Sequence, residues 1–122
     1  MKVPGPDHPI SIEPNGERVV VRFNGQTIAD SKQALALRES RYPKVLYIPR
    51  QDVEMSLLGR TEHSTHCPYK GDAAYYSIQV GGREATNAVW TYESPFPAVA
   101  AIKDHVAFYT DRVDAIEELP SS

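Results

Sequence analysis

Proline and glycine interrupt this chain so often that their spacing disfavours long helices. The 122 residues contain ten prolines and seven glycines. Proline fixes φ and removes a backbone hydrogen-bond donor, while glycine is costly to order inside a helix or a strand. Most of the segments left between these residues are short. The spacing therefore favours strands and tight turns over long helices.

Two segments carry the pattern of a β-hairpin. The first has three consecutive β-branched residues, Val19, Val20 and Val21, followed by Asn24-Gly25, which is a strong signal for a two-residue turn. In the second, Gly81-Gly82 joins two strand-like runs. The predicted strand pairs are Glu17–Phe23 with Gln26–Ala29, and Ala73–Val80 with Arg83–Tyr92.

The segment Ser31–Ser40 fits either of two structures. Asp30 or the residue after it could cap a helix, and several of the following residues have helical propensity. Leu35 and Leu37 nevertheless alternate with Ala and Arg, which is the period of a strand. We favour a short turn that leads into a strand, which pairs with a second strand at Val45–Ile48.

The remaining segments complete one mainly β domain of about seven short strands with short helical turns. Helical turns are expected at Arg50–Val53, Ala98–Ile102 and Asp111–Leu119, and a last strand at His105–Tyr109. The domain is expected to span residues 17–119. An extended proline-rich arm at residues 1–16 precedes it, and a tail at residues 120–122, with a fraying end at Ser121 and Ser122, follows it.

Charge and hydropathy argue against several classes of function. Thirteen basic and sixteen acidic residues give a net charge of -3, and no run of lysine or arginine marks a nucleic-acid surface. No apolar run approaches the roughly 18 residues of a membrane span, and the first residues do not resemble a signal peptide. A single cysteine cannot form an intramolecular disulfide, which fits the cytoplasm. We expect a cytoplasmic protein that binds neither nucleic acid nor membrane.

The densest group of reactive side chains surrounds Cys67, the only cysteine. A thiolate is a nucleophile when nearby cations lower its pKa, and His66, Arg50 and Lys70 are the candidate cations. The alternative is a buried thiol that packs as a small apolar residue, since free cysteines are often buried. A redox cycle at Cys67 would also need an outside thiol, because the chain has no second cysteine.

The four histidines offer further chemistry. His63, His66 and Cys67 form the pattern H-x-x-H-C, and His105 could complete a set of four ligands. Structural zinc sites usually present paired cysteine or histidine knuckles, and a single cysteine breaks that pattern, so we expect no metal and no other cofactor. His105 begins a strand and is instead a candidate general base; an oriented core histidine is the alternative role.

Four residues are candidates for holding a ligand. Arg50 follows a strand-ending proline and Lys70 lies in a turn, so either cation could meet a carboxylate or a phosphate. The alternative for both is an ordinary salt bridge. Tyr75 and Trp90 lie on predicted strands and could stack on a planar ligand, although most rings in so small a sheet protein belong to the core.

Several spaced motifs occur together along most of the chain. They are Val45-Leu46-Tyr47-Ile48-Pro49-Arg50, Thr65-His66-Cys67-Pro68-Tyr69-Lys70-Gly71, Trp90-Thr91-Tyr92 and His105-Val106-Ala107-Phe108-Tyr109. In this set and order the chain resembles a bacterial and fungal family, domain of unknown function 427. The resemblance implies a compact β-tent-like folded sheet, as in methionine sulfoxide reductase B and the thalidomide-binding domain of cereblon. Tyr76 stands where many relatives are expected to have tryptophan.

The family has also carried a nucleotidyltransferase-like label, but this sequence has no Gly-Ser pair followed by Asp-x-Asp to hold metal and triphosphate. The sequence instead favours a cleft near the Cys-Pro-Tyr-Lys-Gly corner that binds a small polar or planar anionic ligand. In this hypothesis Arg50 and Lys70 hold the anionic end, Tyr75 and Trp90 stack, and Cys67 with His105 supplies any reaction. The alternative is a non-enzymatic protein-interaction or homodimerisation module.

Overall fold

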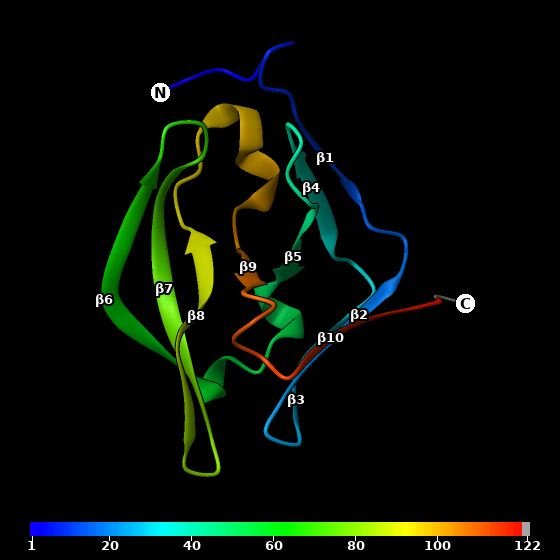
Figure 1. Cartoon of the computed structure of the whole chain (residues 1–122), viewed down its shortest axis with the longest axis vertical. Coiled ribbons are helices and arrows are strands. Elements are labelled where there is room, and N and C mark those ends of the chain that lie inside the picture. Colours follow the sequence, from blue (N-terminus) through cyan, green and yellow to red (C-terminus); the bar gives the residue numbers. More distant parts are fainter. Residues whose placement is uncertain (121–122) are drawn as a thin grey trace.

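The computed structural model describes residues 1–120, which form ten strands and three short 3₁₀ helices (Figure 1). The tail expected at residues 120–122 lies outside this description except for Pro120. The strands are β1 (Ile10–Pro14), β2 (Arg18–Phe23), β3 (Gln26–Ser31), β4 (Leu35–Glu39), β5 (Val45–Pro49), β6 (Leu58–Cys67), β7 (Gly71–Val80), β8 (Arg83–Tyr92), β9 (His105–Phe108) and β10 (Ala115–Leu119). The helices are η1 (Arg50–Asp52), η2 (Met55–Leu57) and η3 (Pro97–Ile102).

The strands make two antiparallel sheets. A seven-stranded sheet has the order β1-β4-β5-β9-β8-β7-β6, and a three-stranded sheet has the order β10-β2-β3. All register pairs are antiparallel, as expected for strands joined by short turns. These sheets confirm the prediction of a single mainly β domain with short helical turns.

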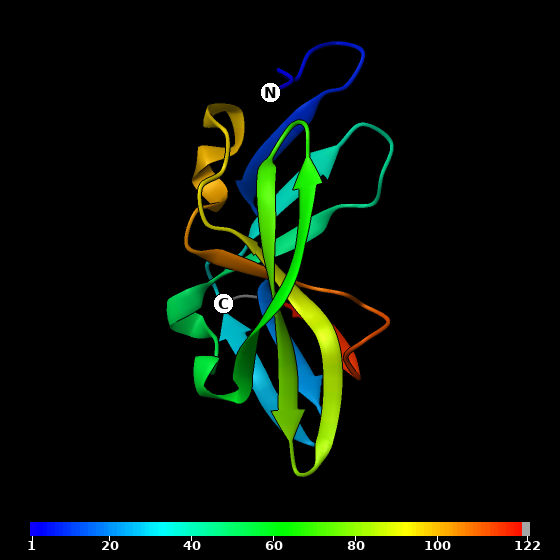
Figure 2. The ribbon, with the colours of Figure 1, turned by 90° about the vertical axis from the view of Figure 1, so that its left-hand side faces the viewer.

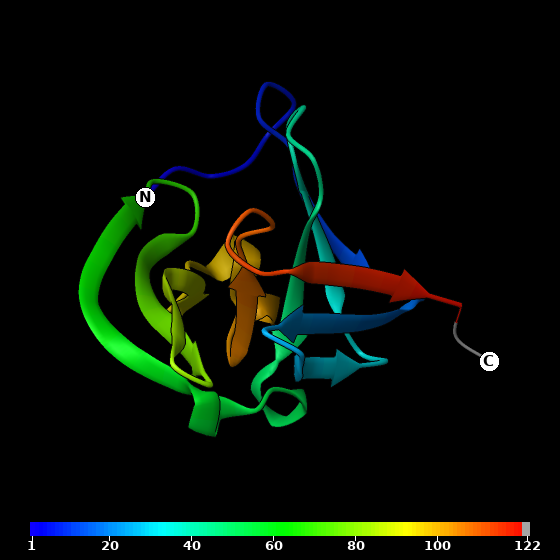
Figure 3. The same ribbon diagram turned by 60° about the horizontal axis from the view of Figure 1, so that its bottom comes forward.

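The large sheet bends sharply where β5 meets β9. These two strands share only two register pairs, Ile48 with Val106 and Pro49 with His105. Viewed from its lower end, the molecule has β6 and β7 on one side and β5, β4 and β1 on the other (Figure 3). The sheet is therefore folded over, and residues from its two halves face each other.

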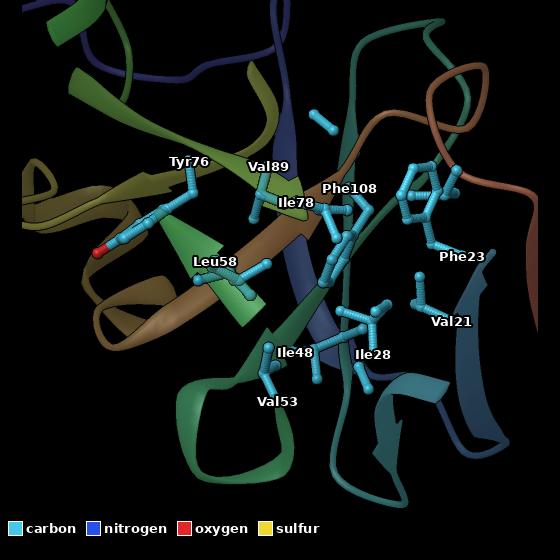
Figure 4. Close-up of a cluster of buried hydrophobic side chains, with 14 of the residues drawn as sticks. Val21, Phe23, Ile28, Ile48, Val53, Leu58, Tyr76, Ile78, Val89 and Phe108 are labelled. Atoms are coloured by element: carbon cyan, nitrogen blue, oxygen red, sulfur yellow. The ribbon is translucent and has the colours of Figure 1, made fainter. Parts of the chain in front are cut away.

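The folded sheet encloses two clusters of buried side chains. The first core lies between the two sheets and includes Val21, Phe23, Ile28, Ile48, Tyr76, Ile78, Val89 and Phe108 (Figure 4). The second core lies between the two halves of the large sheet and under η3, and it contains Leu37, Tyr47, Ala73, Tyr75, Tyr92, Val99, Ile102 and Ala107. Tyr75 and Tyr76 are neighbours on β7, so they face opposite sides of the strand and enter different cores.

Both predicted hairpins are confirmed. The β2–β3 turn has Asn24 at φ 49° and Gly25 at φ 78°, and the β7–β8 turn has Gly81 and Gly82 at φ 58° and 83°. Two consecutive positive φ values are the requirement of the turn that matches strand twist, and asparagine and glycine adopt them most readily. The ambiguous segment after Asp30 is a strand, β4, paired with β5 as expected.

Three strands were not expected. The helical turn predicted over Asp111–Leu119 is wrong in its second half, because Ala115–Leu119 is β10 and pairs with β2. Leu58–Cys67, which has no strand-like alternation, is the long edge strand β6. Within the expected arm, Ile10–Pro14 pairs with β4 as β1. β1 and β10 depend on partners distant in the sequence, whereas β6 pairs with the next strand, β7, across the short turn between Cys67 and Gly71.

The N-terminal arm returns to the end of the molecule that carries the β6–β7 turn (Figure 2). The backbone N–H of Lys2 donates to the carbonyl oxygen of Pro68 at 2.7 Å. The ring of His8 stacks on Tyr69 with 4.0 Å between ring centroids. The arm thus straps across its own chain. Among residues 1–120, no helix is both long enough and apolar enough to cross a bilayer.

Candidate functional site

An aromatic cleft opens between the β4–β5 hairpin and the strands β8 and β9. It consists of two adjoining pockets, one of about 210 Å³ and one of about 640 Å³. Both pockets are lined by Glu39, Tyr42, Pro43, Val45, Trp90 and Tyr109. Because they share these six residues, the two pockets adjoin each other, and together they are called the aromatic cleft.

The smaller part, called the tyrosine pocket, collects five phenol rings, which come from β5, β7, β8, the β4–β5 turn and the position after β9. Its remaining lining residues are Leu37, Tyr47, Lys70, Tyr75 and Tyr92. Strand geometry explains the gathering: Trp90 and Tyr92 share one face of β8, and Tyr75 is the register partner of Trp90 on β7. The bend of the sheet then brings Tyr47 of β5 opposite them.

Hydrogen bonds and ring contacts fix the aromatic side chains. The indole Nε1 of Trp90 donates to the hydroxyl oxygen of Tyr47 at 3.3 Å. The hydroxyl oxygens of Tyr75 and Tyr109 lie 3.4 Å apart, and the Tyr75 hydroxyl also bonds that of Thr65 at 2.9 Å. The Trp90 and Tyr109 ring centroids are 4.5 Å apart, within the range of favourable aromatic pairs.

The hydroxyls of Tyr47, Tyr92 and Tyr109 are protonated at neutral pH. Burial is the main cause that raises the pKa of Tyr47 and of Tyr92 well above the ordinary value. Burial, reinforced by the hydrogen bond with Tyr75, raises the pKa of Tyr109 to about 12. The pocket therefore offers O–H groups, which can donate to a ligand acceptor.

A largely buried ion pair, Glu39 with Lys70, lines the tyrosine pocket. Lys70 Nζ donates to Glu39 Oε1, and the other carboxylate oxygen of Glu39 lies 2.7 Å from His8 Nε2. Burial tends to raise the pKa of Glu39, but the hydrogen bonds from Lys70 and then His8 outweigh it, and the pKa is lowered. Glu39 is therefore ionised at neutral pH, and the charge of Lys70 is neutralised within the protein.

The larger part of the cleft, called the apolar pocket, lies at the seam between the two sheets. Beyond the shared residues it is lined by Val21, Lys44, Leu46, Ile48, Phe108, Thr110, Ile116 and Glu118. The two charged members belong to one cluster, since Lys44 Nζ donates to Glu118 Oε1 at 2.8 Å and to Asn15 Oδ1 at 3.0 Å. This cluster links β5 to β10.

The structure brings together three of the six residues singled out from the sequence. Lys70, Tyr75 and Trp90 line the tyrosine pocket. Cys67 lies close by but does not line it: the residue ends β6 and packs, half-buried, against the second core. His66 points to the other face of β6, where its ring nitrogen lies 2.7 Å from Asp72. His63 packs against Tyr75 with 4.4 Å between ring centroids.

Arg50 and His105 do not line the aromatic cleft. Arg50 Nη1 donates to the Tyr76 hydroxyl at 3.0 Å, and its guanidinium lies 5.7 Å from the centre of that ring. Tyr76 belongs to the first core, on the other face of β7 from Tyr75 (Figure 4). His105 Nδ1 lies 2.7 Å from the carbonyl oxygen of Lys103. His105 is the register partner of Pro49, the residue before Arg50. The two residues therefore neighbour each other and not the thiol.

Sequence reasoning missed Glu39, Tyr42 and Tyr47 as site residues. Tyr47 follows from the alternation of β5 once the bend of the sheet is known, and Tyr42 lies in a turn that the sequence indicated. Glu39 gives no local signal, because its partners His8 and Lys70 are each 31 residues away. Within residues 1–120, no three histidine, cysteine, aspartate or glutamate side chains are grouped as a metal site.

Comparison with known proteins agrees with the resemblance seen in the motifs. A family model described as "Domain of unknown function (DUF427)" matches residues 11–119. The chain therefore belongs to that family. Among curated proteins, no match is found. The matched range covers every strand except the first residue of β1, so it contains the whole of the aromatic cleft.

Proposed function

We propose that this member of the family binds a small planar molecule in the aromatic cleft. The observation that carries the proposal is the position of Trp90, the single tryptophan of the chain, in a cleft where tyrosine rings from several strands converge. Aromatic side chains supply large apolar contact area and prefer offset or edge contacts with other rings. Ligand pockets typically combine such surfaces with a few fixed polar groups.

Tyr42 supports the same proposal from the mouth of the cleft. Its side chain lines both pockets and is 69% exposed, the most exposed aromatic ring of those lining the cleft. An exposed ring at the rim gains apolar contact when a ligand fills the space beneath it. A planar ligand would then lie between Tyr42 and the half-buried pair Trp90 and Tyr109.

The charges of the lining favour a neutral ligand. Lys70 is paired with Glu39, and Lys44 with Glu118, so each lysine charge is already balanced. The sequence suggested an anionic group held by Arg50 and Lys70; Arg50 lies elsewhere, and Lys70 would have to leave a buried partner. The protonated tyrosine hydroxyls instead suit carbonyl or ring-nitrogen acceptors.

Intrinsic fluorescence tests this proposal directly, because all tryptophan emission comes from Trp90. Uracil, nicotinamide and 4-hydroxybenzamide are neutral planar probes, and benzoate is the charged comparison. We expect saturable quenching or a spectral shift with neutral probes and a weaker response to benzoate. Arg50→Ala and His105→Ala are matched controls outside the cleft and should bind like the unmodified protein. Tight binding of benzoate alone, or binding lost in Arg50→Ala, would contradict the proposal.

A homodimerisation module is the competing proposal, and the edge strand β6 favours it. β6 ends the large sheet, and its residues 62–66 are all exposed. An unpaired strand edge offers backbone groups to a second copy of the chain. A concentration-dependent dimer in gel filtration, dispersed by proline at position 64, would support it. A monomer at all concentrations would exclude it. A cytoplasmic location, which the single cysteine suggested, is also part of the proposal.

A further inference from the structure

The two parts of the aromatic cleft differ in chemistry. The tyrosine pocket presents phenol hydroxyls and the Glu39–Lys70 pair in a volume of about 210 Å³. The apolar pocket, of about 640 Å³, is walled by aliphatic and aromatic carbon from both sheets, including Leu46, Phe108 and Ile116. Pockets for drug-sized ligands usually span roughly 300–1,000 Å³. Only the apolar pocket reaches that range, so a ligand confined to the tyrosine pocket would leave most of the cleft empty.

The apolar pocket adjoins the place where the ring is proposed to stack. Trp90 and Tyr109 line both pockets, and so does Val45. A substituent on a ring seated against Trp90 would therefore border the apolar pocket, which Ile116 lines. Leu46 and Ile116 are half-buried, which leaves part of their apolar surface for a ligand to cover.

Apart from Glu39, the charged residues that line the apolar pocket are Lys44 and Glu118. Lys44, Asn15 and Glu118 are hydrogen-bonded to one another there. A charged substituent would have to compete with this cluster and lose water in an apolar channel, which is costly. An uncharged hydrocarbon substituent meets neither cost.

We infer that the ligand is amphipathic, with a neutral planar head bearing hydrogen-bond acceptors in the tyrosine pocket and an uncharged apolar chain in the apolar pocket. This inference rests on the proposed function and deepens it by naming the ligand class. The apolar chain of the ligand would lie along β5 and β10, under Tyr42. Specificity then has two sources: hydroxyl donors select the head, and the length of the apolar pocket selects the chain.

Alkyl esters of 4-hydroxybenzoic acid test the inference, because methyl, propyl and pentyl esters share one neutral planar head. Affinity is measured by quenching of Trp90 fluorescence. Burial of each added methylene should tighten binding about threefold to fourfold. Equal affinities along the series would overturn the inference and leave the proposed function standing. If no ester quenches Trp90, both fail.

Variants on β10 test whether the apolar chain of the ligand occupies the apolar pocket. Ile116→Phe fills the apolar pocket and should abolish the gain from chain length while the methyl ester still binds. Leu119→Phe is the matched control, because position 119 faces the other side of the strand from Ile116 and Glu118 and does not line the cleft. A gain that persists in Ile116→Phe, with the fold intact by circular dichroism, would overturn the inference.

A second pair of probes needs no variant. Butyl 4-hydroxybenzoate and its analogue with a terminal carboxylate have nearly the same length and differ in charge. The neutral ester should bind at least about tenfold more tightly, because the carboxylate would lose water against the apolar lining while Lys44 is already paired with Glu118. Equal or tighter binding of the charged analogue would overturn the inference even if Ile116→Phe does not fold.

Discussion

Trp90 and Tyr47 join the two halves of the folded sheet through one side-chain hydrogen bond. The indole Nε1 of Trp90, on β8, donates to the Tyr47 hydroxyl, on β5, at 3.3 Å, and the two rings meet edge to face with centroids 6.4 Å apart. Between these strands lies β9, whose pairing with β5 is only two residues long. The contact therefore supports the bend and also sets the indole in the cleft.

Replacement of Tyr47 by phenylalanine should destabilise the protein by about 1 kcal/mol. Tyr47 is 1% exposed, so no water can take the place of the hydroxyl that Tyr47→Phe removes. The indole N–H of Trp90 then loses its hydrogen-bond acceptor. Urea unfolding gives the change in free energy, and the Trp90 emission maximum reports the altered surroundings of the ring. Tyr109→Phe is the matched control, because Tyr109 makes no hydrogen bond to Trp90. Equal effects of the two variants would show that the Tyr47 hydroxyl has no special role.

The Glu39–Lys70 pair should make stability depend on acid pH. Because the folded-state pKa of Glu39 is lowered from 4.5, its stabilising contribution is full above the unfolded pKa and disappears as pH falls through the folded pKa. Urea unfolding of the wild type and of Glu39→Gln between pH 3 and 7 measures the difference. We expect Glu39→Gln to cost about 1–3 kcal/mol at pH 7 and much less at pH 3. A constant difference across this range would contradict the assignment.

Lysine 70 gives the complementary experiment. Lys70→Met keeps the length of the side chain and leaves Glu39 with His8 as its remaining hydrogen-bond partner. The carboxylate is then only partly compensated, so stability at pH 7 should fall by about 1–3 kcal/mol and recover as Glu39 becomes protonated. Lys44→Met is the control, because its partner Glu118 is at the surface and its loss should cost under about 1 kcal/mol.

Tyr42 should contribute to ligand binding and hardly at all to stability. At 69% exposure, Tyr42→Ala removes little buried surface, so the free energy of unfolding should change by less than about 0.5 kcal/mol. If the ring stacks on the ligand, the same variant should weaken binding roughly twofold to tenfold, and Tyr42→Phe should restore it. Fluorescence titration with the best-bound probe measures both variants. Unchanged affinity in Tyr42→Ala would remove this residue from the site.

Local sequence signals predicted two hairpins, and distant pairings decided β1 and β10. Asn24-Gly25 and Gly81-Gly82 specify their turns by backbone conformation alone, and both predictions are confirmed. Ala115–Leu119 has no such signal; it is a strand because β2 offers it an edge that lies about ninety residues earlier. The sequence indicated a helical turn there, since propensity cannot anticipate a partner so far away.

The same reasoning explains which parts of the candidate site were predictable. Trp90 and Tyr75 could be placed on one side of a hairpin from the period of two, and they do line one pocket. Arg50 could not be separated from them, because the bend between β5 and β9 decides which face of the sheet it meets. Glu39 could not be recognised at all, because its role arises from two segments that meet it only after folding.

Cys67 should be slow to react in the native protein. Its side chain is half-buried against the second core, and the neighbouring side chains of His66 and Lys70 are hydrogen-bonded to Asp72 and Glu39, respectively. A thiol reacts quickly when it is exposed and its thiolate is favoured by unpaired positive charge. We expect the reaction with DTNB at pH 7 to be at least about tenfold slower than that of free cysteine, and to reach the free rate in guanidinium.

The two outcomes of that experiment lead to different readings of the cleft. A slow native reaction, with ligand binding unchanged in Cys67→Ser, means that the thiol packs behind the tyrosine pocket and takes no part in binding. A native rate faster than that of free cysteine would mean that the surroundings of Cys67 activate the sulfur. In that case Lys70→Met should slow the reaction, because Lys70 lies in the same turn, and its backbone N–H donates to the Cys67 carbonyl oxygen at 3.3 Å. His66→Ala then separates the contribution of the His66 side chain from that of Lys70.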